Sequence, residues 1–200
     1  MDLLIQKPLQ GVVAVILAGG VGSRIGLPIP KQLLPVAGQT SLEHTLAVFD
    51  SAQGIDSIIV MMEATHIHEA VKILTSGRFA KFKAVYPGGS TRNDTTRAAL
   101  DAIADPDTKV LFHDAGRPLV DHRIIQDYID ALENYDAVEA AISSVDTIIE
   151  VDAENCITAV PRRSTLRRGQ TPQAFRRGIL SRPTKLRPET QLSKLPTIFP

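Results

Sequence analysis

The sequence predicts an α/β protein built on a doubly wound, Rossmann-like sheet, mixed but mostly parallel, from which a β-hairpin arm protrudes. Short, nearly all-apolar runs alternate with segments of helical periodicity, which is typical of a parallel sheet covered on both faces. Glycine-rich turns follow several of these runs, where such sheets bind ligands. Near residue 146 the alternation stops, and two short strands around a turn are expected instead.

The predicted elements follow one another in regular order from residue 12. The expected strands are Val12–Ala18, Ser57–Met62, Lys83–Tyr86 and Lys109–His113. The expected helices lie near Ser41–Ala52, Thr65–Ser76, Thr91–Ala104 and Arg123–Asn134. In the third helix, residues 98, 99, 102 and 103 are apolar and share one face at a period of 3.6 residues. Ser90 or Thr91 is expected to cap its N-terminus.

The last third of the chain departs from this pattern. Residues 146–151 and 157–160 predict a hairpin around residues 152–155. A two-stranded ribbon is marginally stable alone, so we expect it to pack on something else, such as a second subunit. Residues 176–200 carry prolines at 183, 188, 196 and 200 and no clean period, which predicts a poorly structured tail. The expected organisation is a domain over 1–175, with the arm at about 145–162, followed by this tail.

Composition excludes several classes of function. Lys plus Arg and Asp plus Glu both number 22, so the net charge is zero, which argues against general binding to nucleic acid or to a membrane surface. A single cysteine, Cys156, excludes an internal disulfide and a cysteine-rich metal site. The N-terminus is too short and polar for a signal peptide, and no apolar run approaches the ~20 residues of a membrane span. We therefore expect a cytoplasmic protein.

The segment LAGGVGSRIGLPIPKQ, residues 17–32, directly follows the first predicted strand. Its glycines let the backbone approach a ligand closely, and two prolines stiffen the path between Arg24 and Lys31. Backbone N–H groups with two cations suit a polyphosphate, although a flexible surface loop with solvated charges is the alternative. A Walker A motif is absent, and Ile25 stands where a dinucleotide fingerprint needs glycine. A phosphate cradle is the favoured interpretation.

The segment HDAGRP, residues 113–118, follows another predicted strand. Asp114 would be repelled by a bound phosphate unless a cation lay between them, and Mg²⁺ is the usual bridge. The alternative is that Asp114 pairs with Arg117 or caps a turn. His113 is expected to be packed rather than to bind a ligand. The loop Pro87–Ser90 also lies between a strand and a helix, so three loops are expected to converge at one edge of the sheet.

Five motifs in order point to one family: LAGGVGSRIGLPIPKQ, PGGSTRND, HDAGRP, Asp146-Thr147 and GQTPQAF. Over about Val13 to Arg176 the chain closely resembles the cytidylyltransferases that activate small polyol phosphates, namely 2-C-methyl-D-erythritol 4-phosphate cytidylyltransferase and ribitol-5-phosphate cytidylyltransferase. The resemblance implies an enzyme that converts CTP and a polyol phosphate to a CDP-polyol and pyrophosphate. It also implies Mg²⁺ as cofactor and a homodimer whose arms complete the active sites.

The same resemblance implies roles for individual residues. Those expected to bind the nucleotide are Leu17, Ala18, Gly19, Gly20, Gly22, Gly88, Gly89, Ser90 and Thr95. Catalysis would fall to Arg24, Lys31 and Arg163, and Asp114 would bind Mg²⁺. The residues expected to bind the substrate are Arg117, Thr147, Arg163 and Thr171. In the family the positions of Thr147 and Arg163 come from the partner's arm.

Two points are left open by the sequence. The runs at residues 89–95 and 144–148 favour ribitol 5-phosphate over 2-C-methyl-D-erythritol 4-phosphate as the substrate. Residues 176–200 lack the acidic stretch and the N-I-K-[VI]-T segment with which the family continues, so the alternative function is a truncated, catalytically impaired CTP-binding domain. A nicotinamide-dependent oxidoreductase is disfavoured by the glycine spacing.

Overall fold

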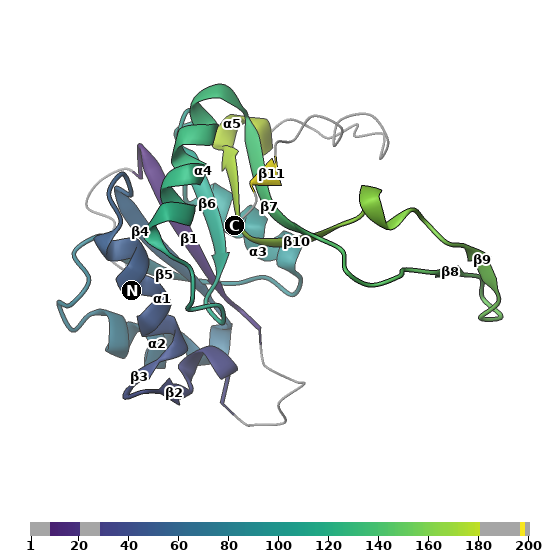
Figure 1. Cartoon of the computed structure of the whole chain (residues 1–200). Helices are drawn as coiled ribbons and strands as arrows, with labels where there is room; N and C mark the ends of the chain where they lie inside the picture. Colours follow the sequence, from purple (N-terminus) through teal and green to yellow (C-terminus); the bar gives the residue numbers. More distant parts are fainter. Residues whose placement is uncertain (1–8, 21–28, 181–196, 199–200) are drawn as a thin grey trace.

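The structure, a computed structural model, describes residues 9–20, 29–180 and 197–198. Its centre is a seven-stranded sheet in the order β11-β7-β10-β6-β1-β4-β5. The strands are β1 (Val12–Ala18), β4 (Ser57–Met62), β5 (Phe82–Pro87), β6 (Lys109–Asp114), β7 (Ala137–Ser143), β10 (Arg167–Arg176) and β11 (Thr197–Ile198). β1, β4, β5 and β6 run parallel, whereas β10 is antiparallel to both of its neighbours. The predicted mixed, mostly parallel α/β sheet is confirmed (Figure 1).

Helices cover both faces of this sheet. They are α1 (Ser41–Ser51), α2 (Ile67–Leu74), α3 (Arg92–Asp101), α4 (His122–Asn134) and the short α5 (Arg177–Leu180). Three single-turn helices accompany them: η1 (Lys31–Leu33), η2 (Ala64–His66) and η3 (Arg163–Thr165). Of the described helices, none is long and apolar enough to cross a membrane.

The alternation of β1 shows how the two layers form. Ala14 and Ile16 point into the larger core, which α1, α2 and α4 cover. Val13 and Val15 point into the smaller core, which α3 covers. Because successive side chains of a strand point to opposite faces, a strand buried on both faces must be apolar throughout. This explains why the four predicted strands match the structure within one residue at each end.

Local capping sets the start of the helix nearest the site. At α3, Thr91 Oγ1 accepts from the backbone N–H of Asp94 at 3.1 Å, and the Asp94 carboxylate accepts from the N–H of Thr91 at 3.2 Å. This reciprocal pair satisfies two of the N–H groups that a helix start leaves free. The predicted cap at Thr91 is therefore confirmed.

Two long strands lie outside the predicted set. β7 and β10 extend the sheet beyond β6, and β10 is largely polar and contains Pro172. Proline normally argues against a strand interior, because it has no N–H to donate to the ladder. Here the pairing of β10 with β7 shifts register between Gly169 and Gln173, and Pro172 lies within that irregular stretch.

The tail departs from its predicted lack of structure where the structure describes it. Residues 177–180 form α5, and residues 197–198 pair with β7 as β11. The N–H groups of Arg177 and Gly178 donate to Thr108 O and Pro106 O, each at 2.8 Å. These bonds hold the segment beside the start of β6. Both donor residues precede Pro183, the first proline of the tail, in the sequence.

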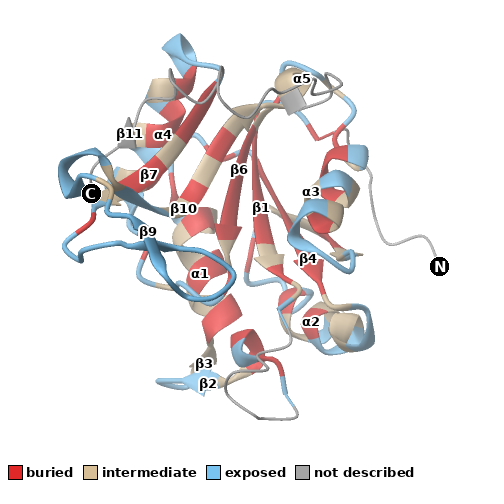
Figure 2. Cartoon of the chain, turned by 90° about the vertical axis from the view of Figure 1, so that its right-hand side faces the viewer, coloured by how far each residue is buried: buried red, intermediate tan, exposed pale blue. Residues whose placement is uncertain are grey.

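The arm lies between β7 and β10 and projects away from the sheet (Figure 1). Its paired strands, β8 (Glu150–Val151) and β9 (Ile157–Ala159), flank the predicted turn, but pairing covers fewer residues than expected. Six large apolar side chains of the arm are exposed, and the arm is coloured as exposed in Figure 2: Val145, Ile148, Ile149, Val151, Ile157 and Val160. Exposed apolar side chains gathered on one segment are typical of interaction surfaces.

Candidate active site at the carboxyl edge of the sheet

The candidate site is centred where β1 and β6 end side by side. Leu17 of β1 is paired with Asp114 of β6, and the N–H of Ala115 donates to Leu17 O at 2.9 Å. A Cβ added to Gly19 or Gly20 would have no heavy atom of the described residues within 4 Å, so no described side chain covers their backbone. The predicted Gly22 and Arg24 lie outside the described residues.

Lys31 is brought to this edge by the short helix η1. The adjacent Gln32 is buried, and its side-chain amide donates to the carbonyl of Ala18 at the end of β1. The Lys31 side chain then passes over the turn after β6, because its Cε lies 3.1 Å from where a Cβ of Gly116 would be. The structure thus brings Lys31 to the turn that carries Asp114, as the sequence predicts.

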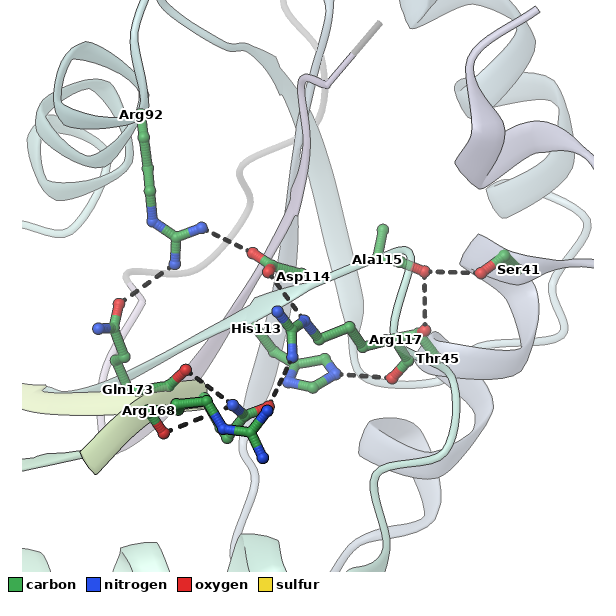
Figure 3. Close-up of polar contacts among 11 residues, drawn as sticks. Ser41, Thr45, Arg92, His113, Asp114, Ala115, Arg117, Arg168 and Gln173 are labelled. Atoms are coloured by element: carbon green, nitrogen blue, oxygen red, sulfur yellow. Dashed lines mark hydrogen bonds and ion pairs between the residues drawn. The ribbon is translucent and has the colours of Figure 1, made fainter. Parts of the chain in front are cut away.

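Asp114 stands between two arginines (Figure 3). Its Oδ1 accepts from Arg92 at 2.7 Å, and its Oδ2 lies 3.3 Å from Arg117 Nε. The Asp114 side chain is 29% exposed, so its carboxylate is accessible to a ligand. In the protein without ligands Asp114 therefore pairs with Arg117, which is the alternative that the sequence left open. Arg92 is a second partner that the sequence did not indicate.

The turn after β6 is anchored from below by buried side chains. Ser41 and Thr45 of α1 donate to the carbonyl of Ala115, at 2.9 and 3.1 Å. His113 is buried, packs at 5.3 Å against the ring of Phe49, and places Nε2 3.0 Å from the carbonyl of Arg117. Since a carbonyl only accepts, Nε2 carries the proton. Burial lowers the pKa of His113 and keeps the ring neutral. The expected packing role of His113 is confirmed.

The predicted base-binding loop after β5 is built by its own polar groups. The N–H of Gly88 donates to Met62 O at 2.7 Å, and that of Gly89 donates to Thr95 Oγ1 at 3.0 Å. Ser90 donates to the Asp94 carboxylate at 2.9 Å. Hydrogen bonds from Thr91 and Ser90 lower the pKa of Asp94. The loop is thus held in its shape by its own hydrogen bonds.

The predicted substrate residues fall into two groups. Arg117 and Thr171 belong to the sheet side: Arg117 is paired with Asp114, and Thr171 lies in β10, the strand beside β6, with a buried hydroxyl that has no partner among the described residues. Thr147 and Arg163 instead lie in the arm, which projects away from the sheet that carries Asp114 (Figure 1). Arg163 donates to Val145 O at 3.2 Å.

An open groove lies at the base of the arm. Its volume is about 450 Å³, and it is lined by Ser143, Ser144, Arg162, Arg163, Ser164 and Arg167. Arginines and hydroxyls in this arrangement suit an anionic group. The single chain therefore holds its predicted cationic residues in two separate places, at the sheet edge and on the arm.

Mg²⁺ fits the site only as an ion shared with a ligand. Among the described residues no group of three or more His, Cys, Asp or Glu side chains could enclose a metal. Mg²⁺ commonly binds one or two carboxylates and completes its shell with water and substrate phosphate oxygens. Asp114, accessible beside the open backbone of Gly19 and Gly20, suits that kind of site, with triphosphate oxygens completing the shell.

Sequence comparison identifies relatives over most of the chain. The sequence profile of the family described as 2-C-methyl-D-erythritol 4-phosphate cytidylyltransferase matches residues 12–191. The enzyme of that name from Thermobifida fusca is 46% identical over 177 residues, covering 86% of this chain and 71% of the relative. The bifunctional ribulose 5-phosphate reductase/CDP-ribitol pyrophosphorylase of Haemophilus influenzae is 43% identical, covering 85% of this chain but only 36% of the relative.

Structural comparison agrees. The crystal structure of 4-diphosphocytidyl-2C-methyl-D-erythritol synthase from Anaerococcus prevotii superposes with a TM-score of 0.75 at 26% identity. The match covers 95% of this chain and 87% of the neighbour. The profile reaches 15 residues beyond Arg176, where the motif resemblance ends.

Proposed function

Because the chain belongs to the 2-C-methyl-D-erythritol 4-phosphate cytidylyltransferase family, we propose that it transfers the cytidylyl group of CTP to the phosphate of a small polyol phosphate. A phosphate oxygen of the acceptor attacks the α-phosphorus of CTP, and the bond to the β-phosphate breaks as pyrophosphate leaves. The observation that carries the proposal is the meeting of Lys31, Asp114 and the open Gly19–Gly20 backbone at one sheet edge.

The electrostatics of this edge suit the reaction. Attack of one phosphate on another brings anions together, so positioning and stabilisation of charge dominate the barrier. A positive charge about 4 Å from a phosphate charge contributes on the order of 4 kcal/mol of attraction at an effective dielectric of about 20. We assign Lys31, with Arg24, to the α-phosphate and the backbone at residues 19–22 to the triphosphate. Asp114 would hold Mg²⁺, which when bound neutralises part of the triphosphate charge.

We further propose that the protein acts as a homodimer. The apolar face of the arm is exposed in the single chain, and Thr147 and Arg163 lie on that arm. A second copy would cover the apolar surface and bring these two residues to the partner's acceptor phosphate. This arrangement accounts for the placement of cationic residues in two separate regions of one chain.

The acceptor is the finer part of the proposal. The sequence runs at 89–95 and 144–148 favour ribitol 5-phosphate, and relatives named for each of the two activities match at 43% and 46% identity. The test is pyrophosphate release from CTP and Mg²⁺ with ribitol 5-phosphate or 2-C-methyl-D-erythritol 4-phosphate in separate reactions. Release with either acceptor supports the transfer and assigns the substrate. Silence with both, from protein that still binds CTP, would contradict it.

A further inference from the structure

A continuous polar chain links the carboxylate of Asp114 to β10, the strand that returns from the arm. Each oxygen of Asp114 has one arginine partner, Arg92 or Arg117. The other ends of these guanidinium groups are held as well. Arg92 Nη2 donates to Gln173 Oε1 at 3.2 Å, and Arg117 Nη1 donates to Gln170 Oε1 at 2.9 Å.

The two glutamines are themselves fixed. Gln173 Nε2 donates to Glu139 Oε1 of β7 at 2.8 Å, and Gln170 Nε2 donates to Gly169 O at 2.9 Å. Regular strand geometry places residues three apart on opposite faces. The register shift between Gly169 and Gln173 interrupts that geometry, and both glutamines reach the same carboxylate through their arginines. Figure 3 shows Gln173 extending toward Arg92, and Arg92 in turn extending toward Asp114.

We propose that Gln173 and Gln170 are positioning residues for the transfer reaction, holding Arg92 and Arg117 in the orientation that fixes Asp114. The inference rests on the proposed function for its kinetic consequence, but not for the contacts. A guanidinium group has five donors and needs several acceptors to adopt one orientation. A glutamine oxygen supplies an acceptor without cancelling the positive charge. The two arginines thus remain cationic toward an incoming triphosphate while being held in place.

The chemistry of the glutamine amide makes the proposal testable by exchange. At position 173 the oxygen serves Arg92 and the nitrogen serves Glu139. Gln173→Ala removes both bonds. Gln173→Glu combined with Glu139→Gln keeps an acceptor for Arg92 and reverses the bond between the two positions, with total charge unchanged. Gln173→Glu alone sets two carboxylates against each other, as like charges at short range.

The experiment measures kcat and KM for pyrophosphate release, and the factor by which Mg²⁺ tightens CTP binding in calorimetry. We expect Gln173→Ala to lower kcat about tenfold, which is 1.4 kcal/mol of barrier, and to reduce the Mg²⁺ factor. Gln170→Ala should act in the same direction through Arg117. The exchanged double variant should recover kcat to within about threefold of the wild type. Gln126→Ala, which removes an exposed glutamine on α4, is the control and should change neither quantity.

The possible outcomes separate this inference from the proposed function. Wild-type kcat and Mg²⁺ factor in Gln173→Ala, or a double variant as impaired as Gln173→Ala, would overturn the positioning role. A wild type that releases no pyrophosphate but binds CTP more tightly with Mg²⁺ would contradict only the transfer reaction. In that case the loss of the Mg²⁺ factor in Gln173→Ala would still support the positioning role. A wild type that does not bind CTP contradicts both.

Discussion

At the scale of single residues, the site depends on cations whose side chains are steered by buried neighbours. Gln32 is buried under β1 and holds the segment from which Lys31 extends. Ser41, Thr45 and His113 hold the turn beneath Asp114. The charged groups face solvent and can meet a ligand, whereas these four neutral side chains are buried.

Lys31→Ala should abolish most turnover without disturbing the fold. Loss of a preorganised charge at the reacting phosphate costs a factor of about 10² to 10³ in kcat, as for removal of an oxyanion donor. Pyrophosphate release measures the loss, and urea unfolding monitors the fold. Lys72→Ala, on the exposed side of α2, is the matched control. Near-normal release by folded Lys31→Ala protein would remove Lys31 from the catalytic role.

His113 should make the fold sensitive to acid. Its pKa in the folded protein is lowered by burial from the ordinary 6.5. Below pH 6.5 the unfolded chain therefore binds a proton that the folded protein does not, and stability falls as the pH falls. His113→Gln keeps a donor for the carbonyl of Arg117 but does not titrate. Urea midpoints at pH 7.5 and 5.5 should differ more for the wild type than for the variant. Equal differences would contradict this assignment.

At the scale of elements, the loop between β5 and α3 combines a helix cap with a binding surface. Gly89 leaves no room for a side chain, because a Cβ there would lie 2.3 Å from Asp94 Cβ and 2.8 Å from Asp94 C. Both contacts are with Asp94, whose side chain bonds back to the N-cap Thr91, and its backbone carbon cannot move without shifting the first turn of α3. That turn also begins with Arg92, the partner of Asp114.

Gly89→Ala should therefore destabilise the protein and weaken CTP binding together. Overpacking at a fixed backbone contact costs about 1 to 3 kcal/mol, and displacement of α3 moves Arg92 as well. Urea unfolding and calorimetry with CTP measure the two effects. Ser90→Ala, which loses an exposed hydrogen bond on the same loop, is the control for the unfolding measurement. A Gly89→Ala protein with wild-type stability would contradict the packing argument.

At the scale of the whole molecule, the proposed dimer shares its catalytic groups between chains. Lys31 lies at the sheet edge of one chain, and Arg163 lies on the arm that would reach its partner. A two-fold symmetric dimer has two equivalent sites, each built from both chains. Variants that damage different contributions to a site can therefore complement each other.

An equal mixture of Lys31→Ala and Arg163→Ala chains should recover activity after exchange of subunits. In a mixed dimer one site carries both substitutions and the other carries neither. Random pairing makes half of the dimers mixed, so about a quarter of the wild-type activity is expected. Light scattering should give twice the chain mass of 21.7 kDa. If Arg163 served its own chain, no mixture would recover activity.

Much of the fold can be predicted from the sequence because the strands of the parallel half are buried on both faces. Their apolar runs and the intervening helical periods identify β1, β4, β5 and β6 almost to the residue. β10 is not predicted, for the opposite reason. Its sequence is largely polar and contains Pro172. It forms a strand because it pairs with β6 and β7, and not because its residues favour a strand on their own.

Some residues of the candidate site can likewise be predicted from the sequence, and others cannot. The glycines of the first loop, Lys31 and Asp114 stand out in the sequence, because phosphate binding needs open backbone and fixed cations at strand ends. Gln173 and Arg92 carry no such signal, since they lie 81 residues apart and meet only when β10 inserts beside β6. Local sequence alone thus determined the elements of the parallel half of the sheet and the class of chemistry. The tertiary structure decided which polar groups pair, because hydrogen bonds between distant segments depend on the strand order that brings them together.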